Sequence, residues 1–283
     1  MRNYTLFSDV LYGDFEIDGV INELIQSTPF QRLKGIHQGG ALFLVDPTQQ
    51  QTRFEHSIGV YWLVNHFEGN LEERVAALLH DVSHTAFSHV GDYVFDHSDE
   101  DYHESIFQEI INHPEIQIIL SNHHLSHVFD SFDSYTLLER SLPDICADRI
   151  DYTLRDLYHS GRISREEINE FIADIKVEKG KLILSTPESA SWFSLKYAEL
   201  NESYFRRPEY LYANHRFTEL LKNAIADGKL KTEDLMSTDQ EVISKLELSG
   251  FKDELLKISQ LEDFDKFQIE KAAAKIKKRE VSL

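Results

Sequence analysis

The sequence predicts a mostly α-helical protein that carries two short β segments. Apolar residues recur every three or four positions through much of the chain, which is the spacing of a helix that buries one face. This spacing covers residues 20–36, 58–67, 72–79, 104–111, 135–142 and 143–157. In contrast, residues 175–184 form two alternating apolar runs around Lys179-Gly180, which predicts a small β-hairpin.

Three further segments complete this prediction. Residues 5–18 mix β-branched and aromatic side chains around a glycine, which predicts a short N-terminal hairpin or extended arm. Ser164 and Glu167 form a capping-box pattern, which predicts a helix over residues 164–175. Helical spacing resumes over about residues 189–226.

One large domain, with or without an appendage, suits the length of 283 residues. No internal repeat, Gly/Ser linker or low-complexity tract marks a firm boundary. The least integrated stretch starts at about residue 229 and includes a charged tail over residues 262–279. The Lys-rich end of this tail, residues 271–279, is typical of a solvated helix face. We therefore expect the main domain over residues 1–228 and a C-terminal helical appendage over residues 229–283, either separate or part of the same domain.

The composition is that of an ordinary globular protein, with 41% hydrophobic and 28% charged residues. No stretch approaches the roughly 20 apolar residues that span a bilayer, and the acidic start lacks the features of a signal peptide. The single cysteine, Cys146, fits a reducing compartment. We therefore expect a cytoplasmic protein that has no membrane partner.

The formal net charge of -20 restricts the class of ligand. A chain with 29 basic and 49 acidic residues repels long polyanions, so nucleic acid is an unlikely partner. A small anion such as a nucleotide remains compatible with this charge, because a local arginine and a metal ion act at short range.

A candidate metal site is indicated where the apolar run 76–79 leads directly into His80 and Asp81. Polar groups against buried surface need hydrogen-bond partners or a metal ion. Neighbours on a helix point about 100° apart, so both can reach one ion only if it lies between helices. His56 and Asp148 are the candidates for the remaining ligands. Two imidazoles and two carboxylates suit one divalent Fe, Mn, Zn, Co or Ni ion with open positions for water and substrate.

The order and spacing of four motifs resemble the HD-domain superfamily, and within it the deoxynucleoside triphosphate triphosphohydrolases. The motifs are Arg53-Phe-Glu-His56-Ser-Ile-Gly59, His80-Asp81-Val-Ser-His84-Thr-Ala-Phe-Ser-His89, His103-Glu104, and Asp148-Arg149-Ile-Asp151-Tyr152-Thr-Leu-Arg155-Asp156. The likeness extends over about residues 10–225. An adjacent His-Asp pair alone is weak support, whereas four motifs in the same order are specific.

The resemblance implies an HD-domain helical bundle and a role for each motif residue. The implied metal ligands are His56, His80, Asp81 and Asp148. The implied catalytic residues, around the reacting phosphate, are His84, His103, Glu104 and Asp92. The implied substrate-binding residues are Arg53, Arg149, Tyr152, Asp156 and Gln38. A magnesium ion bound with the nucleotide is a further option.

Alternatives remain open for several of these residues. A histidine beside a metal site often only orients a ligand, and this role is favoured for His89. Asp92 is equally compatible with a solvated or helix-stabilising carboxylate. Arg149 stands where the triphosphohydrolases often have lysine, which keeps the charge but changes the geometry.

Metal-dependent hydrolysis of a deoxynucleoside triphosphate by a metal-activated water is the preferred function implied by the resemblance. The chain is much shorter than the longer triphosphohydrolases, so their allosteric nucleotide sites are not assumed. Alternatives are hydrolysis of another phosphoester, such as a nucleoside monophosphate, and a nucleotide-sensing or scaffold protein with low turnover. Assembly into a homo-oligomer is left open.

Overall fold

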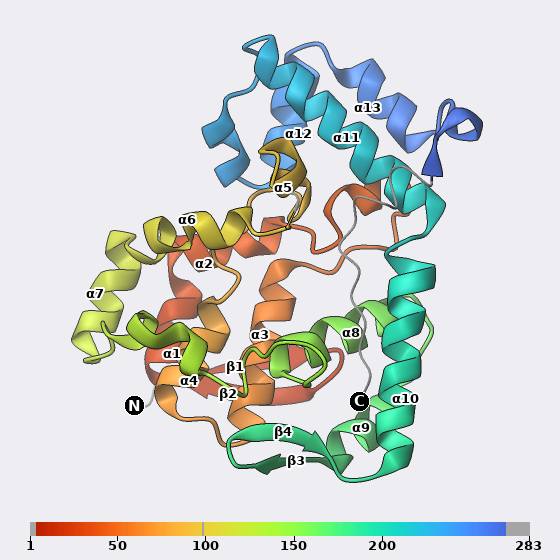
Figure 1. Ribbon diagram of the computed structural model, residues 1–283. Coiled ribbons are helices and arrows are strands. Elements are labelled where there is room, and N and C mark those ends of the chain that lie inside the picture. The colour runs from red at the N-terminus through yellow and green to blue at the C-terminus, as the bar shows by residue number, and fades with distance from the viewer. Residues whose placement is uncertain (1–3, 98, 270–283) are drawn as a thin grey trace.

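The computed structural model describes residues 4–97 and 99–269, and it confirms the mostly helical fold with two small hairpins (Figure 1). The strands are β1 (Tyr4–Asp9), β2 (Gly13–Asp18), β3 (Ile175–Glu178) and β4 (Lys181–Leu184). The α-helices are α1 (Gly19–Gln26), α2 (Thr28–Arg32), α3 (Arg53–His66), α4 (Leu71–Leu79), α5 (Val90–Val94), α6 (Tyr102–Ile111), α7 (Pro114–Asn122), α8 (Ala147–His159), α9 (Arg165–Asp174), α10 (Pro187–Glu199), α11 (Pro208–Ala226), α12 (Asp239–Leu248) and α13 (Lys252–Ser259). Short 3-10 or π turns connect several of them.

Both predicted hairpins form antiparallel two-stranded sheets. In the first, Tyr4 pairs with Asp18 and Asp9 pairs with Gly13 across the turn. The Asp9 carboxylate accepts hydrogen bonds from the backbone N–H groups of Leu11 and Tyr12, at 2.7 and 3.1 Å. The aspartate therefore fixes the turn, and with it the position of the Tyr12 side chain.

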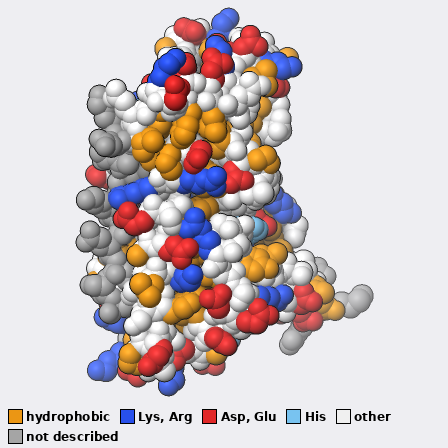
Figure 2. Space-filling view, turned by 90° about the vertical axis from the view of Figure 1, so that its right-hand side faces the viewer, with side chains coloured by type: hydrophobic (Ala, Val, Ile, Leu, Met, Phe, Trp, Pro, Cys, Tyr) orange, Lys and Arg blue, Asp and Glu red, His pale blue; other side chains and the backbone are white. Residues whose placement is uncertain are grey.

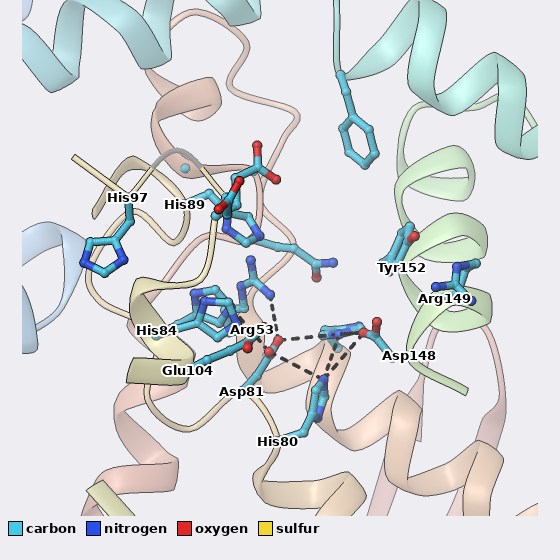
Figure 3. A pocket seen from close by; sticks show the side chains of 18 of the residues that line it. Arg53, His80, Asp81, His84, His89, His97, Glu104, Asp148, Arg149 and Tyr152 are labelled. Atoms are coloured by element: carbon cyan, nitrogen blue, oxygen red, sulfur yellow. Dashed lines mark hydrogen bonds and ion pairs between the residues drawn. The ribbon is translucent and has the colours of Figure 1, made fainter. Parts of the chain in front are cut away.

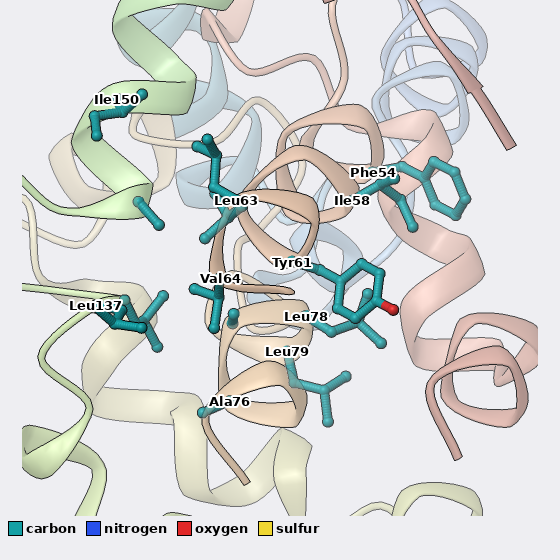
Figure 4. Packing of buried hydrophobic residues seen from close by; sticks show 14 of the residues in the cluster. Phe54, Ile58, Tyr61, Leu63, Val64, Ala76, Leu78, Leu79, Leu137 and Ile150 are labelled. Carbon is teal, nitrogen blue, oxygen red and sulfur yellow. The ribbon is translucent and has the colours of Figure 1, made fainter. Parts of the chain in front are cut away.

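The main hydrophobic core surrounds α3, the central helix, which packs most extensively on α4 and α8 (Figure 4). Leu63 and Val64 of α3 are fully buried, as are Leu78 of α4 and Ile150 of α8. Fully burying such a side chain contributes about 1.5–3 kcal/mol relative to leaving it exposed. Helix α3 is buried on most sides, which explains why its sequence shows weak amphipathic spacing and why that spacing marked only residues 58–67.

A second hydrophobic cluster joins α5 and α11 to the chain after residue 229. Phe87 and Phe217 pack at a ring separation of 4.3 Å, and the buried side chains of Leu235 and Val242 belong to the same cluster. Figure 1 shows α11, α12 and α13 together at one end of the molecule. The described part of the C-terminal region thus packs against the helical body, while the boundary proposed at residue 228 stays a prediction.

Asp239, at the start of α12, ties this C-terminal region to the loop that follows α4. Its buried carboxylate accepts hydrogen bonds from the backbone N–H of Phe87 at 2.6 Å and from the backbone N–H of His37 at 2.8 Å. It also accepts from Nδ1 of the His37 ring at 2.8 Å. Phe87 and Ser88 both have positive φ values, 60° and 51°. Such backbone is costly for residues other than glycine and persists where surrounding contacts impose it.

The predicted helix over residues 135–142 is wrong, because this segment is a turn and extended chain. The backbone N–H groups of Leu137 and Leu138 donate to the Glu73 carboxylate instead of to helical carbonyls, at 2.7 and 3.3 Å. The carbonyl of Leu137 accepts from the N–H of Ala147. Tertiary partners therefore satisfy the backbone that a helix would have satisfied internally.

Other boundaries moved by smaller amounts. The segment 143–157 becomes helical only at Ala147, and the segment 20–36 is divided at Ser27 into two helices. The segment 189–226 is divided before Pro208. Residues 270–279 of the charged tail, including its Lys-rich end, lie outside the described residues.

Among the described residues, no helix is both long enough and apolar enough to span a membrane. On the side that Figure 2 shows, acidic and basic side chains are interspersed and no extended basic patch is visible.

We predict that the His37–Asp239 pair makes stability depend on pH. Burial alone would lower the pKa of His37, but the hydrogen bond and charge of Asp239 raise it above its ordinary value. Burial also raises the pKa of Asp239. A raised histidine pKa means that the folded protein holds the proton more tightly than the unfolded chain. The contribution of this pair to the free energy of unfolding is therefore complete below about pH 6.5, and it is lost as pH rises through the folded-state pKa of His37.

Urea denaturation at a series of pH values tests this prediction. The free energy of unfolding of the wild type should fall as pH rises above about 6.5, and this fall should be smaller in His37→Gln. His127→Gln, in a side chain that is 60% exposed, is the control and should follow the wild type. Equal pH dependence in the wild type and His37→Gln would contradict the prediction.

Candidate metal centre and catalytic cleft

Three helices bring the four predicted metal ligands together at the base of one cleft (Figure 3). His56 comes from the first turns of α3, His80 and Asp81 follow the end of α4, and Asp148 lies in the first turn of α8. His56 Nε2 is 3.0 Å from Asp148 Oδ1, 3.3 Å from His80 Nε2 and 3.5 Å from Asp81 Oδ2. His80 Nε2 is 3.5 Å from Asp81 Oδ1 and 3.6 Å from Asp148 Oδ1.

These separations fit donors around a single divalent ion. Bonds from a transition metal to imidazole nitrogen or carboxylate oxygen are about 2.0–2.2 Å long, so neighbouring donors on one ion lie about 3–3.5 Å apart. The observed donor separations of 3.0–3.6 Å match that range. Cys146 Sγ lies against Glu139 and Arg149, and it groups with Glu139 and Asp148 rather than with His56, His80 and Asp81. The donor set is therefore of the nitrogen and oxygen type.

The electrostatics of the four groups favour positive charge between them. Burial would raise the pKa of Asp81, but His80 and Arg53 hold it well below its ordinary value. Burial would also raise the pKa of Asp148, but its hydrogen bonds to the two histidines lower it. Burial would lower the pKa of His56, yet Asp148 and Asp151 raise it to about 10. Two ionised carboxylates at this point suit a cation.

Hydrogen bonds on the outer ring nitrogens aim both histidines at the centre. His80 Nδ1 donates to the carbonyl of Ala77 at 2.8 Å, and His56 Nδ1 donates to Asp151 Oδ2 at 2.8 Å. Carbonyl and carboxylate oxygens only accept, so Nδ1 carries a hydrogen in both rings and Nε2 is the nitrogen that points to the other donors. Such outer contacts fix the ring orientation of metal-ligating histidines.

A buried ionic chain holds Asp151 in turn. Arg155 donates to both Asp151 oxygens at 2.9 Å, and its Nη2 is 3.1 Å from Asp9 Oδ2 in the first hairpin. The hydroxyl of Tyr12 donates to Asp151 Oδ1 at 2.7 Å. The side chains of Asp151 and Arg155 are both 0% exposed. The N-terminal hairpin therefore takes part in orienting His56, although it lies far from it in the sequence.

Gly59 provides the space for this chain, one turn after His56 on α3. A Cβ atom at position 59 would lie 2.0 Å from Asp151 Oδ1 and 2.4 Å from Arg155 Nη2. Neither side chain has room to withdraw, because both are fully buried. The glycine of the His56-Ser-Ile-Gly59 motif is thus required by close packing.

A second group of histidines, His84, His89 and His103, lines the cleft beside Asp81. The His84 and His103 rings stack at 3.9 Å, and His84 Nε2 is 3.3 Å from Asp81 Oδ1. Burial lowers the pKa of His103 to about 4, and the charges of His89 and Arg53 act in the same direction. Burial and Arg53 also hold the pKa of His84 well below its ordinary value. Both rings are therefore neutral at pH 7, and His103 Nδ1 has no hydrogen-bond partner among the described residues.

Asp92 supports this histidine group from α5. Its carboxylate accepts from His89 Nδ1 at 2.7 Å and from the backbone N–H of Tyr102 at 2.8 Å. It thereby orients His89 and caps the start of α6. Glu104, in the first turn of α6, also lines the cleft and is exposed.

Arg53 links the two groups of site residues. Its Nη1 donates to Asp81 Oδ2 at 2.6 Å, and its Nε donates to Ser88 Oγ at 2.9 Å. Ser88 in turn donates to the carbonyl of His37 at 2.7 Å. The guanidinium is therefore held rigidly next to the metal donors.

The other predicted substrate-binding residues occupy the walls of the cleft, whose volume is about 1880 Å³. Asp156 is buried, accepts from Gln51 Nε2 at 3.0 Å, and has its pKa raised by burial to about 6. Tyr152 shares a hydrogen bond with Tyr197 at 3.1 Å, and Gln38 Oε1 has no partner among the described residues. The cleft is large enough to admit a nucleotide.

Arg149 lies apart from the metal donors in Figure 3. Its guanidinium donates to the carbonyls of Asp144 and Arg140, the latter at 3.0 Å, and it is 3.7 Å from Glu139. These contacts hold the loop before α8. The structure thus brings twelve of the thirteen predicted site residues to the lining of one cleft, and the thirteenth, Asp92, contacts the cleft residue His89. Their individual roles stay predictions.

Sequence reasoning missed the residues that support the site. Asp151 was named only as a member of the fourth motif and was given no role, although its position three residues after Asp148 places it on the same face of α8. Tyr12, Gln51 and Asp239 gave no comparable signal, because their contacts join segments far apart in the sequence.

Comparison with known proteins gives a family match and several likenesses that cover most of this chain. The HD-domain family description matches residues 53–156. The uncharacterised protein YdhJ of Bacillus subtilis is 47% identical over 86% of this chain and 75% of its own length. The metal-dependent phosphohydrolase cns2 of Cordyceps militaris is 29% identical over 92% of this chain and 78% of its own length.

Two further likenesses are more distant. The deoxynucleoside triphosphate triphosphohydrolase SAMHD1 homolog of Dictyostelium discoideum is 23% identical over 90% of this chain and 55% of its own length. A crystal structure of a hypothetical protein from Aquifex aeolicus has a TM-score of 0.72 at 26% identity, covering 92% of this chain and 76% of that one. The arrangement of helices around the site is therefore shared with solved proteins.

We predict that Gly59→Ala strongly destabilises the protein. The added methyl group overlaps Asp151 and Arg155, and disruption of a buried ion pair costs about 3–5 kcal/mol. Ser57→Ala on the same helix is the matched control, because Ser57 Oγ is buried without a partner and its loss should change stability little. Denaturant unfolding measures both variants. A Gly59→Ala protein as stable as Ser57→Ala would show that the close approach at position 59 is unimportant.

Proposed function

The chain belongs to the HD-domain superfamily of metal-dependent phosphohydrolases, and we propose that it hydrolyses a phosphate bond of a nucleotide. One observation carries the proposal: His56, His80, Asp81 and Asp148 converge with donor separations of 3.0–3.6 Å beside a guanidinium and a pair of neutral histidines. Metal ligands, a phosphate-binding cation and proton carriers are the parts that such a reaction requires.

In this proposal the four converging residues hold one divalent transition metal ion. Iron, manganese, zinc, cobalt and nickel all suit two imidazoles and two carboxylates. Such an ion, when bound, lowers the pKa of water and neutralises phosphate charge. Asp151 and the Ala77 carbonyl keep His56 and His80 in the tautomer that presents Nε2.

Proton handling falls to His84 and His103 in the proposal. Their stacked, neutral rings lie beside Asp81 and line the cleft. A bound phosphate adds negative charge nearby, which opposes the lowering of their pKa values and favours uptake of a proton. A protonated imidazole at this place can donate to the departing oxygen. Asp92 orients the group through His89, and Glu104 adds a carboxylate at the rim.

Substrate binding is proposed for the cleft walls. Arg53 is placed to grip a phosphate oxygen, with Arg149 as a further candidate. Asp156 can accept a hydrogen bond from a sugar hydroxyl, while Tyr152 and Gln38 offer contacts to the rest of a nucleoside. A deoxynucleoside triphosphate is the substrate suggested by the motif resemblance and by the likeness to the Dictyostelium discoideum protein. A nucleoside monophosphate is the alternative that the same residues allow.

A screen of metal-reconstituted protein against nucleotides tests the proposed function. Identification of the product matters, because triphosphate, pyrophosphate and single phosphate report cleavage of different bonds. Release of one of these products, lost on chelation and restored by a divalent transition metal, is the expected result. Absence of turnover with every metal and nucleotide would contradict the proposal.

We predict that Asp148→Asn weakens metal binding while leaving the fold intact. The substitution removes a charged donor without changing the side-chain volume, and the carboxylate is held by histidines rather than by core contacts. Metal content by elemental analysis and far-ultraviolet circular dichroism measure the two effects. Asp130→Asn, an exposed position outside the cleft, is the control and should bind metal as the wild type does. Retained metal in an unfolded Asp148→Asn protein would count against the assignment.

We predict that His103→Ala lowers turnover by about 10² to 10⁴ and leaves metal content and substrate affinity nearly unchanged. The reason is that His103 stacks on His84 beside the metal donors without belonging to them. His97→Ala removes a more exposed imidazole from the same cleft and should have little effect.

Two outcomes would refute this role. Loss of metal from His103→Ala would make the residue a ligand or its support. A change confined to the Michaelis constant would make it a residue that only binds substrate.

A further inference from the structure

We infer that the cleft selects a nucleoside monophosphate over the triphosphate of the same nucleoside. This inference rests on the proposed function and specifies the charge of its substrate. It starts from the composition of the cleft wall, where the described residues include eleven aspartates and glutamates but four lysines and arginines. Each phosphate added to a substrate brings further negative charge into this environment.

Three of the four basic side chains are engaged by the wall itself. Arg140 pairs with Asp144 at 2.7 Å, and Lys222 pairs with Asp96. Arg149 donates to two backbone carbonyls of the loop before α8. A cation that is already bonded to protein oxygens must give up those bonds to hold a phosphate.

Arg53 is the basic side chain that faces the metal donors. Its Nε and Nη1 are bonded to Ser88 and Asp81, which leaves Nη2 without a partner among the described residues. One guanidinium edge and one divalent ion can contact the oxygens of a single phosphate group. Enzymes that act on triphosphates instead surround the β- and γ-phosphates with lysine, arginine and magnesium.

Further acidic side chains line the same cleft. Asp133 and Asp144 belong to the wall formed by residues 132–144, where burial and the charge of Asp148 raise the pKa of Glu139 to about 8. Asp99 and Glu219 line the cleft as well. The outer phosphates of a triphosphate would share the cleft with these carboxylates, whereas sugar hydroxyls can donate hydrogen bonds to such groups.

The test compares the mono-, di- and triphosphates of one nucleoside as substrates of the reconstituted protein, without added magnesium. We expect kcat/KM to fall along this series, with the monophosphate favoured over the triphosphate by about tenfold at physiological ionic strength. Raising the salt concentration should narrow the ratio, because screening weakens repulsion of the more highly charged substrate.

A charge-reversal variant tests the cause of the selection. Asp99→Lys combined with Asp133→Lys places two cations on exposed positions of the cleft wall. This variant should raise kcat/KM for the triphosphate several-fold while changing that for the monophosphate much less. Asp227→Lys combined with Glu233→Lys makes the same change in net charge at exposed positions outside the cleft lining, and it should leave the ratio unchanged.

The outcomes separate the inference from the function on which it rests. Hydrolysis with the triphosphate equal to or better than the monophosphate overturns the inference and leaves the phosphohydrolase intact. A monophosphate preference that neither salt nor the charge reversal alters also overturns it, since the selection would then not be electrostatic. Failure to hydrolyse any member of the series, with any metal, refutes the proposed function itself.

Discussion

The bond between His56 and Asp151 is the contact on which the geometry of the site depends. It fixes the ring of His56 so that Nε2 meets the other donors, and it is embedded in a buried chain formed with Arg155, Tyr12 and Asp9. Buried charges are tolerated only when each has partners, so the chain must be complete to be stable. The central helix α3, the first turns of α8 and the N-terminal hairpin are consequently constrained together.

A second constraint acts on the other half of the site, where the C-terminal region holds the loop that carries His84 and His89. Asp239 accepts the N–H of Phe87, and the carbonyl of Leu235 accepts the N–H of Ala86. These contacts maintain the positive φ values at Phe87 and Ser88 and thereby the position of the hydroxyl bonded to Arg53. Residues after 229 are thus part of the support of the cleft.

The fold class and the candidate site were largely predictable, because both leave local signals. Helical spacing marks a segment that buries one face. Burial of the adjacent His80 and Asp81 at the end of an apolar run costs free energy unless both have hydrogen-bond partners or a metal ion. The hairpin at residues 175–184 was equally clear from alternation around Lys179-Gly180.

The errors and omissions concern contacts between distant segments. The stretch 135–142 has helical spacing, but the Glu73 carboxylate takes two of its N–H groups. The need for glycine at position 59 leaves no local signal in the sequence, because it comes from Asp151 and Arg155, which occupy the space that a Cβ atom would take. Arg149, adjacent to a ligand in the sequence, turns to the loop before α8 because successive helical residues point in different directions.

The turn of the first hairpin has a consequence for how the protein acquires its metal ion. Tyr12 and Asp151 are 139 positions apart, so the contact closes a very long loop of chain. Closing a long loop costs conformational entropy, so contacts between residues far apart in the sequence form more slowly than the contacts within a helix. The hairpin can therefore lock the imidazole of His56 only after α8 has reached its place, so the proposed metal site gains its full geometry only when these distant segments have come together.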